Sequence, residues 1–413
     1  MLSRFAGYLA GSWSFQELLG GLGDGRSYSR IPASSVFLSV FGMFSLRLPS
    51  FNEMSIQLRL PNRWEPWTGD RKPSADTLGY ALDRFDLAGL RRMNGAVAAL
   101  FKRKKALERL YPDSHWVAAV DGVETTKSRK RCCAECCRRN VGTDAEPVIE
   151  YYHRYVVLQL VGVAPALMLD AEPVRQGETE CAAALRLLER FKSGYPRFID
   201  ALTLDAFYLQ APFVRRAVGM GYHVVVVLKQ ANRELYQDAE GLFNGVVPQT
   251  IVGVDKTIQI WDVEGLTTWG QAGRPVRVVR QLERQTVRER IAGKLVSREV
   301  ERDWRWAVIS PERKGRPVAE LVGKWGHARW DEETRGFGEL TQHWHLNHCY
   351  RHHPTAMLAC LLILFLAFSL TTVFFTRNLK PQAREGRTRL ALARLLADDL
   401  ALGRTAPFWP RPP

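Results

Sequence analysis

A long apolar segment constrains the fold of this chain more than any other feature of the sequence. Residues Ala356 to Phe375 are twenty consecutive residues without a charge, AMLACLLILFLAFSLTTVFF. That length suits a transmembrane helix, and Arg377 and Lys380 follow it as the flanking anchors of a membrane span would. The same composition also suits a helix that is buried on every side in the core of a large α/β domain. The neighbouring sequence has to separate these two interpretations.

The charge of the chain points to a polyanionic partner. There are 58 Lys and Arg residues against 43 Asp and Glu residues, which gives a formal net charge of +15. Such an excess favours binding to nucleic acid or to an anionic membrane surface. Charged residues at 24% and hydrophobic residues at 46% are ordinary values for globular proteins, so a disordered or fibrous chain is excluded.

The cysteines indicate a reducing compartment or a metal site rather than a disulfide framework. Four of the seven cysteines fall within six residues, and the short apolar run after Arg4 is broken by Ser and Gly, unlike a signal peptide. We therefore expect a cytoplasmic protein. Cys133 and Cys136 have the C-x-x-C spacing of a structural zinc site, which needs four ligands. The other two ligands would come from the group His345, His348, Cys349, His352 and His353. The alternative is a reduced basic loop near DNA, with the histidines packed at a helix junction.

The N-terminal part, residues 1–113, is expected to be a helical DNA-binding region. Ser74 or Asp76 is a suitable helix N-cap, and apolar residues with helical spacing follow. The basic run suits a helix end that faces phosphates, although such runs are also common on solvated faces. It consists of Lys102, Arg103, Lys104 and Lys105.

From residue 114 the pattern changes to strands that alternate with helices. Strands are expected over 116–121, 151–163, 166–174, 199–205 and 223–229, with helices over 178–191 and near 212–220. This order predicts an α/β fold with a mixed sheet and helices on its faces. Residues 114–235 form the first part of this core, 236–316 a β-rich insertion, 317–380 the C-terminal helices, and 381–413 a loosely ordered basic tail.

Two of the expected strands end in an acid, Asp121 and Asp205. Acids at adjacent strand ends can bind the same pair of metal ions, and a third carboxylate from a nearby helix would complete a set of oxygen ligands for Mg²⁺. The candidates for the third acid are Asp331, Glu332, Glu333 and Glu339. The alternative for each Asp is an ordinary turn residue. The sequence has no P-loop and no dinucleotide-binding fingerprint.

The order of these elements and acids resembles the insertion-sequence DDE transposases, which have an RNase H-like catalytic core. It is most similar to the bacterial branch with a β-strand insertion between the second and third acids. That branch has a signature of Arg, three residues and Glu, which Arg329 and Glu333 match, followed here by Gly336 and Phe337. The segment WHLNHCYRHHP (344–354) belongs to the same resemblance.

The sequence departs from that signature at two places. Trp325-Gly326 stands where a Tyr would precede the Arg, and Leu340-Thr341 stands where a Lys would follow the Glu. The resemblance implies that Asp121, Asp205 and Glu333 are catalytic and hold two Mg²⁺ or Mn²⁺ ions. Glu332, one residue away, is the rival for the third position. Arg329 and Lys229 are expected to contact DNA, although Lys229 equally suits a side chain that extends from the sheet edge to solvent.

The expected function is metal-dependent DNA cleavage and strand transfer at the ends of the protein's own insertion sequence. The expected partner is double-stranded DNA, bound by a homodimer in the nucleoid of a prokaryote, without a membrane. A chain that coordinates metal through Glu333 must soon pack on the catalytic sheet, which favours a core helix at 356–375. The alternatives are an integral membrane protein anchored by 356–375 and a catalytically decayed DNA-binding relict.

Overall fold

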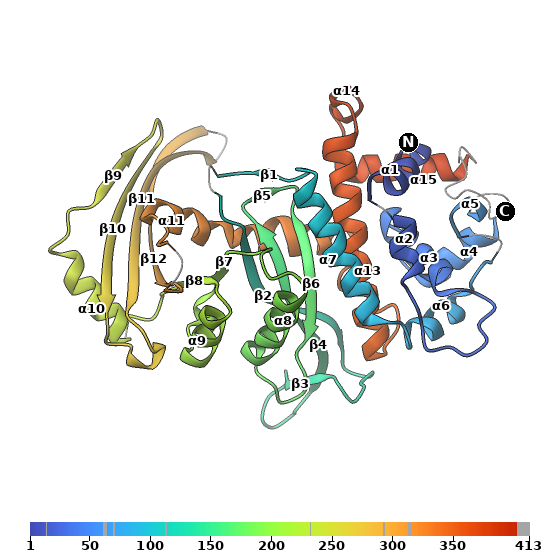
Figure 1. Cartoon of the computed structure of the whole chain (residues 1–413), viewed down its shortest axis with the longest axis horizontal. Coiled ribbons are helices and arrows are strands. Elements are labelled where there is room, and N and C mark those ends of the chain that lie inside the picture. The colour runs from blue at the N-terminus through green and yellow to red at the C-terminus, as the bar shows by residue number, and fades with distance from the viewer. Residues whose placement is uncertain are drawn as a thin grey trace. The chain divides into compact units, whose positions relative to one another are not determined.

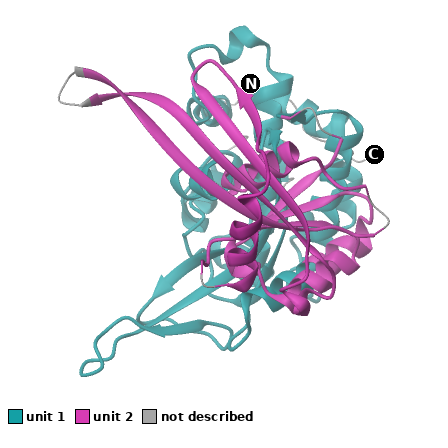
Figure 2. Ribbon diagram, turned by 90° about the vertical axis from the view of Figure 1, so that its left-hand side faces the viewer, with its two compact units in different colours: residues 1–110, 122–187, 333–413 teal, residues 111–121, 188–332 magenta. Residues whose placement is uncertain are grey.

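The computed structural model describes residues 1–13, 15–60, 64–68, 71–111, 114–231, 233–291, 294–312 and 315–402. The chain divides into two compact units (Figure 2). Unit 1 comprises residues 1–110, 122–187 and 333–413, and unit 2 comprises residues 111–121 and 188–332. Among the described residues, strands form a ten-stranded sheet with parallel and antiparallel pairs. This confirms the α/β class, whereas the RNase H-like core stays a prediction.

Unit 1 begins with the helices that the sequence predicts (Figure 1). Leu78 and Leu82 in the helix 75–82 and Leu90 in the helix 87–103 are fully buried. The Ser74 hydroxyl accepts a hydrogen bond from Thr77 N at 3.2 Å and so caps α6, as one of the two predicted caps. The helices are α1 Leu2–Trp13, α2 Phe15–Gly20, α3 Ala33–Ser45, α4 Phe51–Arg59, α5 Glu65–Thr68, α6 Ala75–Leu82 and α7 Leu87–Arg103.

Antiparallel strands form the β part of unit 1. Strand β4 (Ile149–Val161) pairs with β3 (Cys137–Asn140) and with β6 (Leu167–Pro173), and the short strands β1 (Glu108–Arg109) and β5 (Val163–Ala164) pair with each other. The predicted strands 151–163 and 166–174 are therefore confirmed. Strand β2 (Val117–Ser128) and helix α8 (Glu180–Gly194) each begin in one unit and end in the other.

The long apolar segment forms helix α13 (Pro354–Val373), which continues as a π-helical turn, Phe374–Asn378. It packs against α3, α6, α7 and β6 within unit 1 (Figure 1). The helix is long and apolar enough to cross a membrane, yet every residue of its apolar window is buried in the fold. Its carbonyl oxygen at Leu362 accepts a hydrogen bond of 3.1 Å from the buried Asn94 side chain of α7. The apolar segment therefore occupies the position expected of a buried core helix, the alternative to a membrane span.

The C-terminal residues correct one prediction, because the expected loose tail contains helices. Helix α14 (Pro381–Arg384) is followed by α15 (Arg389–Ala401), whose first turn is capped by the Thr388 hydroxyl. Leu392, Leu396 and Leu400 of α15 recur at every fourth position and are buried, so one apolar face holds this helix on unit 1. The part of the predicted tail from 403 to 413 lies outside the described residues.

Unit 2 contains the predicted alternation of strands and helices. The first part of β2 pairs in parallel with β7 (Ala201–Leu204), and β7 pairs in parallel with β8 (His223–Val227). The 3₁₀ turn Ala206–Tyr208 and helix α9 (Ala211–Gly219) connect β7 to β8. All five residues of β8 are buried, as the uninterrupted apolar pattern of a central parallel strand predicts.

The predicted β-rich insertion starts with a helix, which is a second correction. Helix α10 (Glu234–Phe243) forms because Leu235, Ala239 and Phe243 are spaced four apart and give it one buried face. The predicted strands follow, and the last of them pairs with β8, so the insertion extends the sheet of unit 2. These strands are β9 Gln249–Val252, β10 Lys256–Leu266, β11 Val276–Ile291 and β12 Lys294–Ile309.

Helical structure resumes after the insertion as predicted. Helix α11 (Ala319–Ala328) is followed by a π-helical segment, Glu332–Phe337, and by α12 (Gly338–His343). The π-helical segment contains Glu332 and Glu333, the two rivals for the predicted third acid. Single π-helical turns inside helices occur frequently at functional sites.

Candidate active site

Asp121 and Asp205 each directly follow the last paired residue of two neighbouring parallel strands of unit 2. The ladder between β2 and β7 pairs Val117 with Ala201 and ends with Val120 opposite Leu204. The residue after Val120 is Asp121, and the residue after Leu204 is Asp205. Parallel neighbours lie roughly 4.8 Å apart and their side chains alternate with the same period, so equivalent residues stand side by side on the same face. The two side chains are 25% and 32% exposed, which leaves both carboxylates within reach of solvent.

The local structure around Asp121 differs from the prediction. Asp121 was expected to end its strand, whereas β2 continues to Ser128. The continuation is polar and half-buried, and Glu124 in it pairs with Arg139 at 3.0 Å and with Arg154 at 2.6 Å. These ion pairs within unit 1 stabilise the strand segment, although its polar sequence is typical of a loop.

Asp205 directly follows β7, as predicted, and its two carboxylate oxygens have different surroundings. Oδ1 accepts a hydrogen bond of 2.8 Å from Phe207 N and so caps the 3₁₀ turn that follows. Oδ2 lies 3.8 Å from the Lys229 ammonium, whose side chain is 54% exposed. Lys229 therefore stands beside Asp205 at the end of the sheet. Its contact with DNA stays a prediction.

Arg329 lies beneath Asp121 rather than on the surface. Its guanidinium Nη1 is 3.7 Å from Asp121 Oδ2, its side chain is only 4% exposed, and it stacks on the Trp330 ring at 4.7 Å. A buried arginine this close to the carboxylate limits the movement of the Asp121 side chain. The DNA contact predicted for Arg329 stays a prediction, and its surroundings suit a residue that positions Asp121.

The two rival acids differ in exposure. Glu332, in unit 2, has no exposed surface, and its backbone N–H donates to Arg329 O at 3.0 Å. Glu333, the first residue of the following part of unit 1, is half-buried and lines an open groove together with Gly338, Glu339 and His343. Glu333 therefore borders solvent, whereas Glu332 does not.

Two glycines in this region, Gly326 and Gly336, are required by close packing. A Cβ added at Gly326 would overlap with the indole of Trp306 on β12. A Cβ at Gly336 would overlap with Gln159 Oε1 and lie 2.7 Å from Met168 Cε, two residues on the strands of unit 1. Both positions thus bring a helical segment into close contact with a sheet.

The predicted basic run ends helix α7. Lys102 and Arg103 lie in its last turn, where positive charge is favourable, and Lys104 is the C-cap residue. The Lys104 ammonium donates a hydrogen bond to Ser12 O and lies 5.3 Å from the centre of the Trp13 ring. Arg103, Lys104 and Lys105 are exposed. Their contact with DNA stays a prediction.

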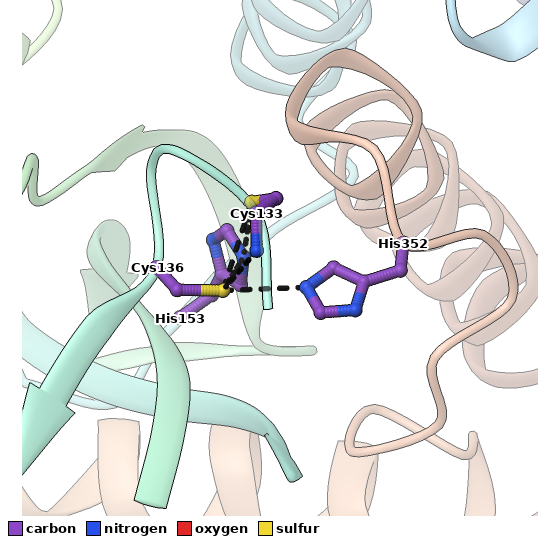
Figure 3. A group of neighbouring side chains, drawn as sticks. All are labelled: Cys133, Cys136, His153 and His352. Atoms are coloured by element: carbon purple, nitrogen blue, oxygen red, sulfur yellow. Dashed lines mark hydrogen bonds between the residues drawn. The ribbon is translucent and has the colours of Figure 1, made fainter. Parts of the chain in front are cut away.

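A cluster of four metal-ligand side chains lies within unit 1 (Figure 3). It consists of Cys133, Cys136, His153 and His352, whose ligand atoms all lie within 4.8 Å of one another. This cluster could hold a metal ion such as Zn²⁺. Among the residues proposed from the sequence, Cys133, Cys136 and His352 are members, whereas His345, His348, Cys349 and His353 are not.

His153 was missed from the sequence because its role depends on strand register. The ladder between β3 and β4 pairs Cys137 with Tyr152, so the next step places Cys136 opposite His153. Burial, and then the nearby His352, lower the pKa of His153 to about 4. Burial and then Arg131 lower the pKa of His352, while burial raises the pKa of Cys136 to about 11. Both shifts favour the neutral imidazole, the form that binds metals.

Comparisons with known proteins show only distant similarity, and only to solved structures. No family model and no curated protein matches the chain. Among solved structures, the chain is similar to the one described as "Cryo-EM structure of piggyBac transposase synaptic complex with hairpin DNA". The TM-score is 0.38 and the sequence identity 12%, over 95% of this chain and 77% of that chain. A TM-score of this size does not establish a common fold, so the functional proposal rests on the residues of the site.

Proposed function

We propose that this protein is a DDE transposase, an enzyme that cuts and joins double-stranded DNA at the ends of its own insertion sequence. The observation that carries the proposal is the pair of acids that directly follow the last paired residues of two neighbouring parallel strands, Asp121 on β2 and Asp205 after β7. A chance turn residue has no reason to recur at the same level of the adjacent strand. Two part-exposed carboxylates in that arrangement suit the binding of divalent metal ions.

The donor atoms at this place fit Mg²⁺ or Mn²⁺, because both ions prefer carboxylate oxygen ligands. In the proposal, Asp121, Asp205 and Glu333 would hold two such ions. The ions would supply activation of an attacking oxygen and stabilisation of the leaving oxygen in phosphoryl transfer. The protein's own contribution is to orient the carboxylates: Arg329 holds Asp121, and the Phe207 N–H holds Asp205.

Exposure supports Glu333 as the third acid. A metal ligand that also meets DNA has to be reachable, and Glu333 borders an open groove whereas Glu332 has no exposed surface. The positive charge of the chain, including Lys229 and the run from Lys102 to Lys105, would contact DNA phosphates. We further propose that the DNA complex is a homodimer in the bacterial cytoplasm, without a membrane.

A decayed DNA-binding relict is the second candidate, and one observation favours it. Leu340-Thr341 stands where the resembling family has a Lys, so neither residue supplies a positive charge for a phosphate contact, and Leu340 is fully buried. A supercoiled plasmid that carries the inverted repeats flanking the gene separates the two candidates. The proposal predicts nicking that requires Mg²⁺ or Mn²⁺ and stops with a chelator. Binding of these ends without nicking under any divalent ion would identify a relict.

The same assay decides between the rival acids. Glu333→Gln should abolish nicking, because an amide keeps the shape of the side chain and loses the charge that metal ions need. Glu332→Gln, the neighbouring control, should keep most of the activity. If Glu332→Gln is inactive and Glu333→Gln is active, the third metal ligand is Glu332 instead of Glu333. The assignment of Asp121 and Asp205 is not affected by that result.

A further inference from the structure

We propose that Cys133, Cys136, His153 and His352 bind one structural Zn²⁺ ion, which fastens the basic loop before β3 to the start of α13. The four residues come from three places in unit 1: the loop 129–136, the strand β4, and the junction just before α13 (Figure 3). This inference is independent of the proposed catalytic site, whose metal ligands would be carboxylates.

Four of the six distances between the ligand atoms are close to those of a tetrahedral zinc site. Zinc lies about 2.3 Å from cysteine sulfur and about 2.0–2.1 Å from histidine nitrogen, so neighbouring ligand atoms in a tetrahedron are roughly 3.3–3.8 Å apart. The two sulfurs are separated by 3.6 Å. His153 Nε2 lies 3.4 Å from Cys133 Sγ and 3.2 Å from Cys136 Sγ, and His352 Nε2 lies 3.3 Å from Cys136 Sγ. Each histidine presents the same ring nitrogen, Nε2, to the cluster.

The backbone around the two cysteines also suits bound metal. Cys133 N donates a hydrogen bond of 3.2 Å to Cys136 Sγ, and Cys136 N donates to Cys133 O at 3.2 Å, which closes a tight turn. Hydrogen bonds from backbone N–H groups to ligand sulfurs orient the ligands and stabilise their negative charge. The separation of 3.6 Å is far from the roughly 2.05 Å of a disulfide bond.

Charge and burial point to zinc rather than to an empty polar cluster. Cys136 and His153 are each only 4% exposed. Two thiolates and two neutral imidazoles around Zn²⁺ form a site without net charge, which a protein interior tolerates well. Two cysteines and two histidines are also a common ligand set of structural zinc sites. A closed set of four ligands leaves no position for a substrate, so the site is structural.

The ion would join segments that are far apart in the sequence. Cys133 and His352 are the part-exposed members, one on the loop and one at the start of the most buried helix of unit 1. The loop carries the exposed residues Arg129, Lys130 and Arg131, and its free movement would be limited by the metal. Because trypsin cleaves after Arg and Lys in mobile segments, this loop provides a direct readout of metal binding.

The test begins with the metal content of the whole protein, purified from zinc-supplemented cells. One equivalent of zinc per chain is expected. Cys133→Ser and His352→Asn should each lose it, and trypsin should then cut at 129–131 at least about tenfold faster. Cys132→Ser and His345→Asn are the matched controls, because both residues are exposed neighbours outside the cluster. His345 has a positive φ of 57°, a conformation that asparagine tolerates.

Three results would overturn the proposal. They are the absence of zinc both after purification and after reconstitution with Zn²⁺, full zinc content in Cys133→Ser and His352→Asn, and a Cys133–Cys136 disulfide in the alkylated native protein. Reconstitution of the wild-type chain with Co²⁺ needs no variant and should give the visible absorption of tetrahedral, thiolate-bound cobalt. Each readout is separate from DNA nicking, so failure of the zinc site and failure of the transposase proposal are distinguishable.

Discussion

At the scale of single residues, small side chains decide how closely helix α11 approaches the sheet of unit 2. Gly323 lies against Gln281 and Gly326 against Trp306, and a Cβ at either position would overlap with that neighbour. Trp306 is 1% exposed, so its indole lies in the buried interior of unit 2. The position of α11 matters because Arg329, which follows directly, contacts Asp121.

Gly326→Ala should therefore destabilise the protein. In an open helix the change from Gly to Ala stabilises by roughly 0.5–1 kcal/mol, whereas overpacking a buried contact costs about 1–3 kcal/mol. Urea unfolding followed by tryptophan fluorescence measures the difference. Gly241 in α10 is the matched control, because a Cβ there meets nothing within 4 Å, and Gly241→Ala should be neutral or stabilising. Equal stability of both variants would show that the contact with Trp306 is not tight.

At the scale of elements, a buried carboxylate links β11, β10 and α11. Glu283 of β11 accepts from Lys256 Nζ at 2.9 Å and lies 3.0 Å from His327 Nε2. Burial alone would raise the pKa of Glu283, but the hydrogen bonds and charges of His327 and Lys256 lower it to about 2. The folded protein thus holds this carboxylate ionised well below its ordinary range.

This shift predicts how stability depends on pH. Because the pKa of Glu283 is lower in the folded than in the unfolded chain, its stabilising effect is complete above about pH 5. That effect disappears as the pH falls towards 2. Glu283→Gln should lower the free energy of unfolding at pH 7 by on the order of 2 kcal/mol and flatten this acid dependence. Trp304 and Trp306 contact the His327 ring, so their fluorescence reports the transition. An unchanged slope between pH 5 and 2 in the variant would contradict the assignment.

The elements also show where local sequence patterns suffice and where they fail. The strands β4, β6, β7 and β8 and the helices between them follow from periodicity, because each buries an uninterrupted face. The second half of β2 was missed because Glu124 and its neighbours are polar, and their ion pairs come from other strands. His153 was missed for a similar reason, since strand register and not sequence spacing places it opposite Cys136.

At the scale of the whole molecule, the net charge of +15 should determine binding to DNA. Neutralising phosphates with Lys and Arg releases counterions, so the affinity for duplex DNA should fall steeply as the salt concentration rises. Fluorescence anisotropy with a duplex that carries the element's ends, measured from about 50 to 200 mM salt, should show a loss of at least about a hundredfold. A nearly constant affinity over this range would contradict a phosphate-dominated contact.

The pair Asp121 and Asp205 is the centre of the proposed mechanism, and one measurement tests it most directly. Mg²⁺-dependent nicking of a plasmid with the element's own ends is compared between the parent and Asp121→Asn and Asp205→Asn, beside binding to the same DNA. Asp238→Asn is the control, because Asp238 is an exposed acid on α10. Carboxylates that hold metal ions act on the transition state, so each active-site variant should lose at least about a hundredfold in rate while it binds DNA normally. Nicking by both variants at the rate of Asp238→Asn would contradict the proposed catalytic site.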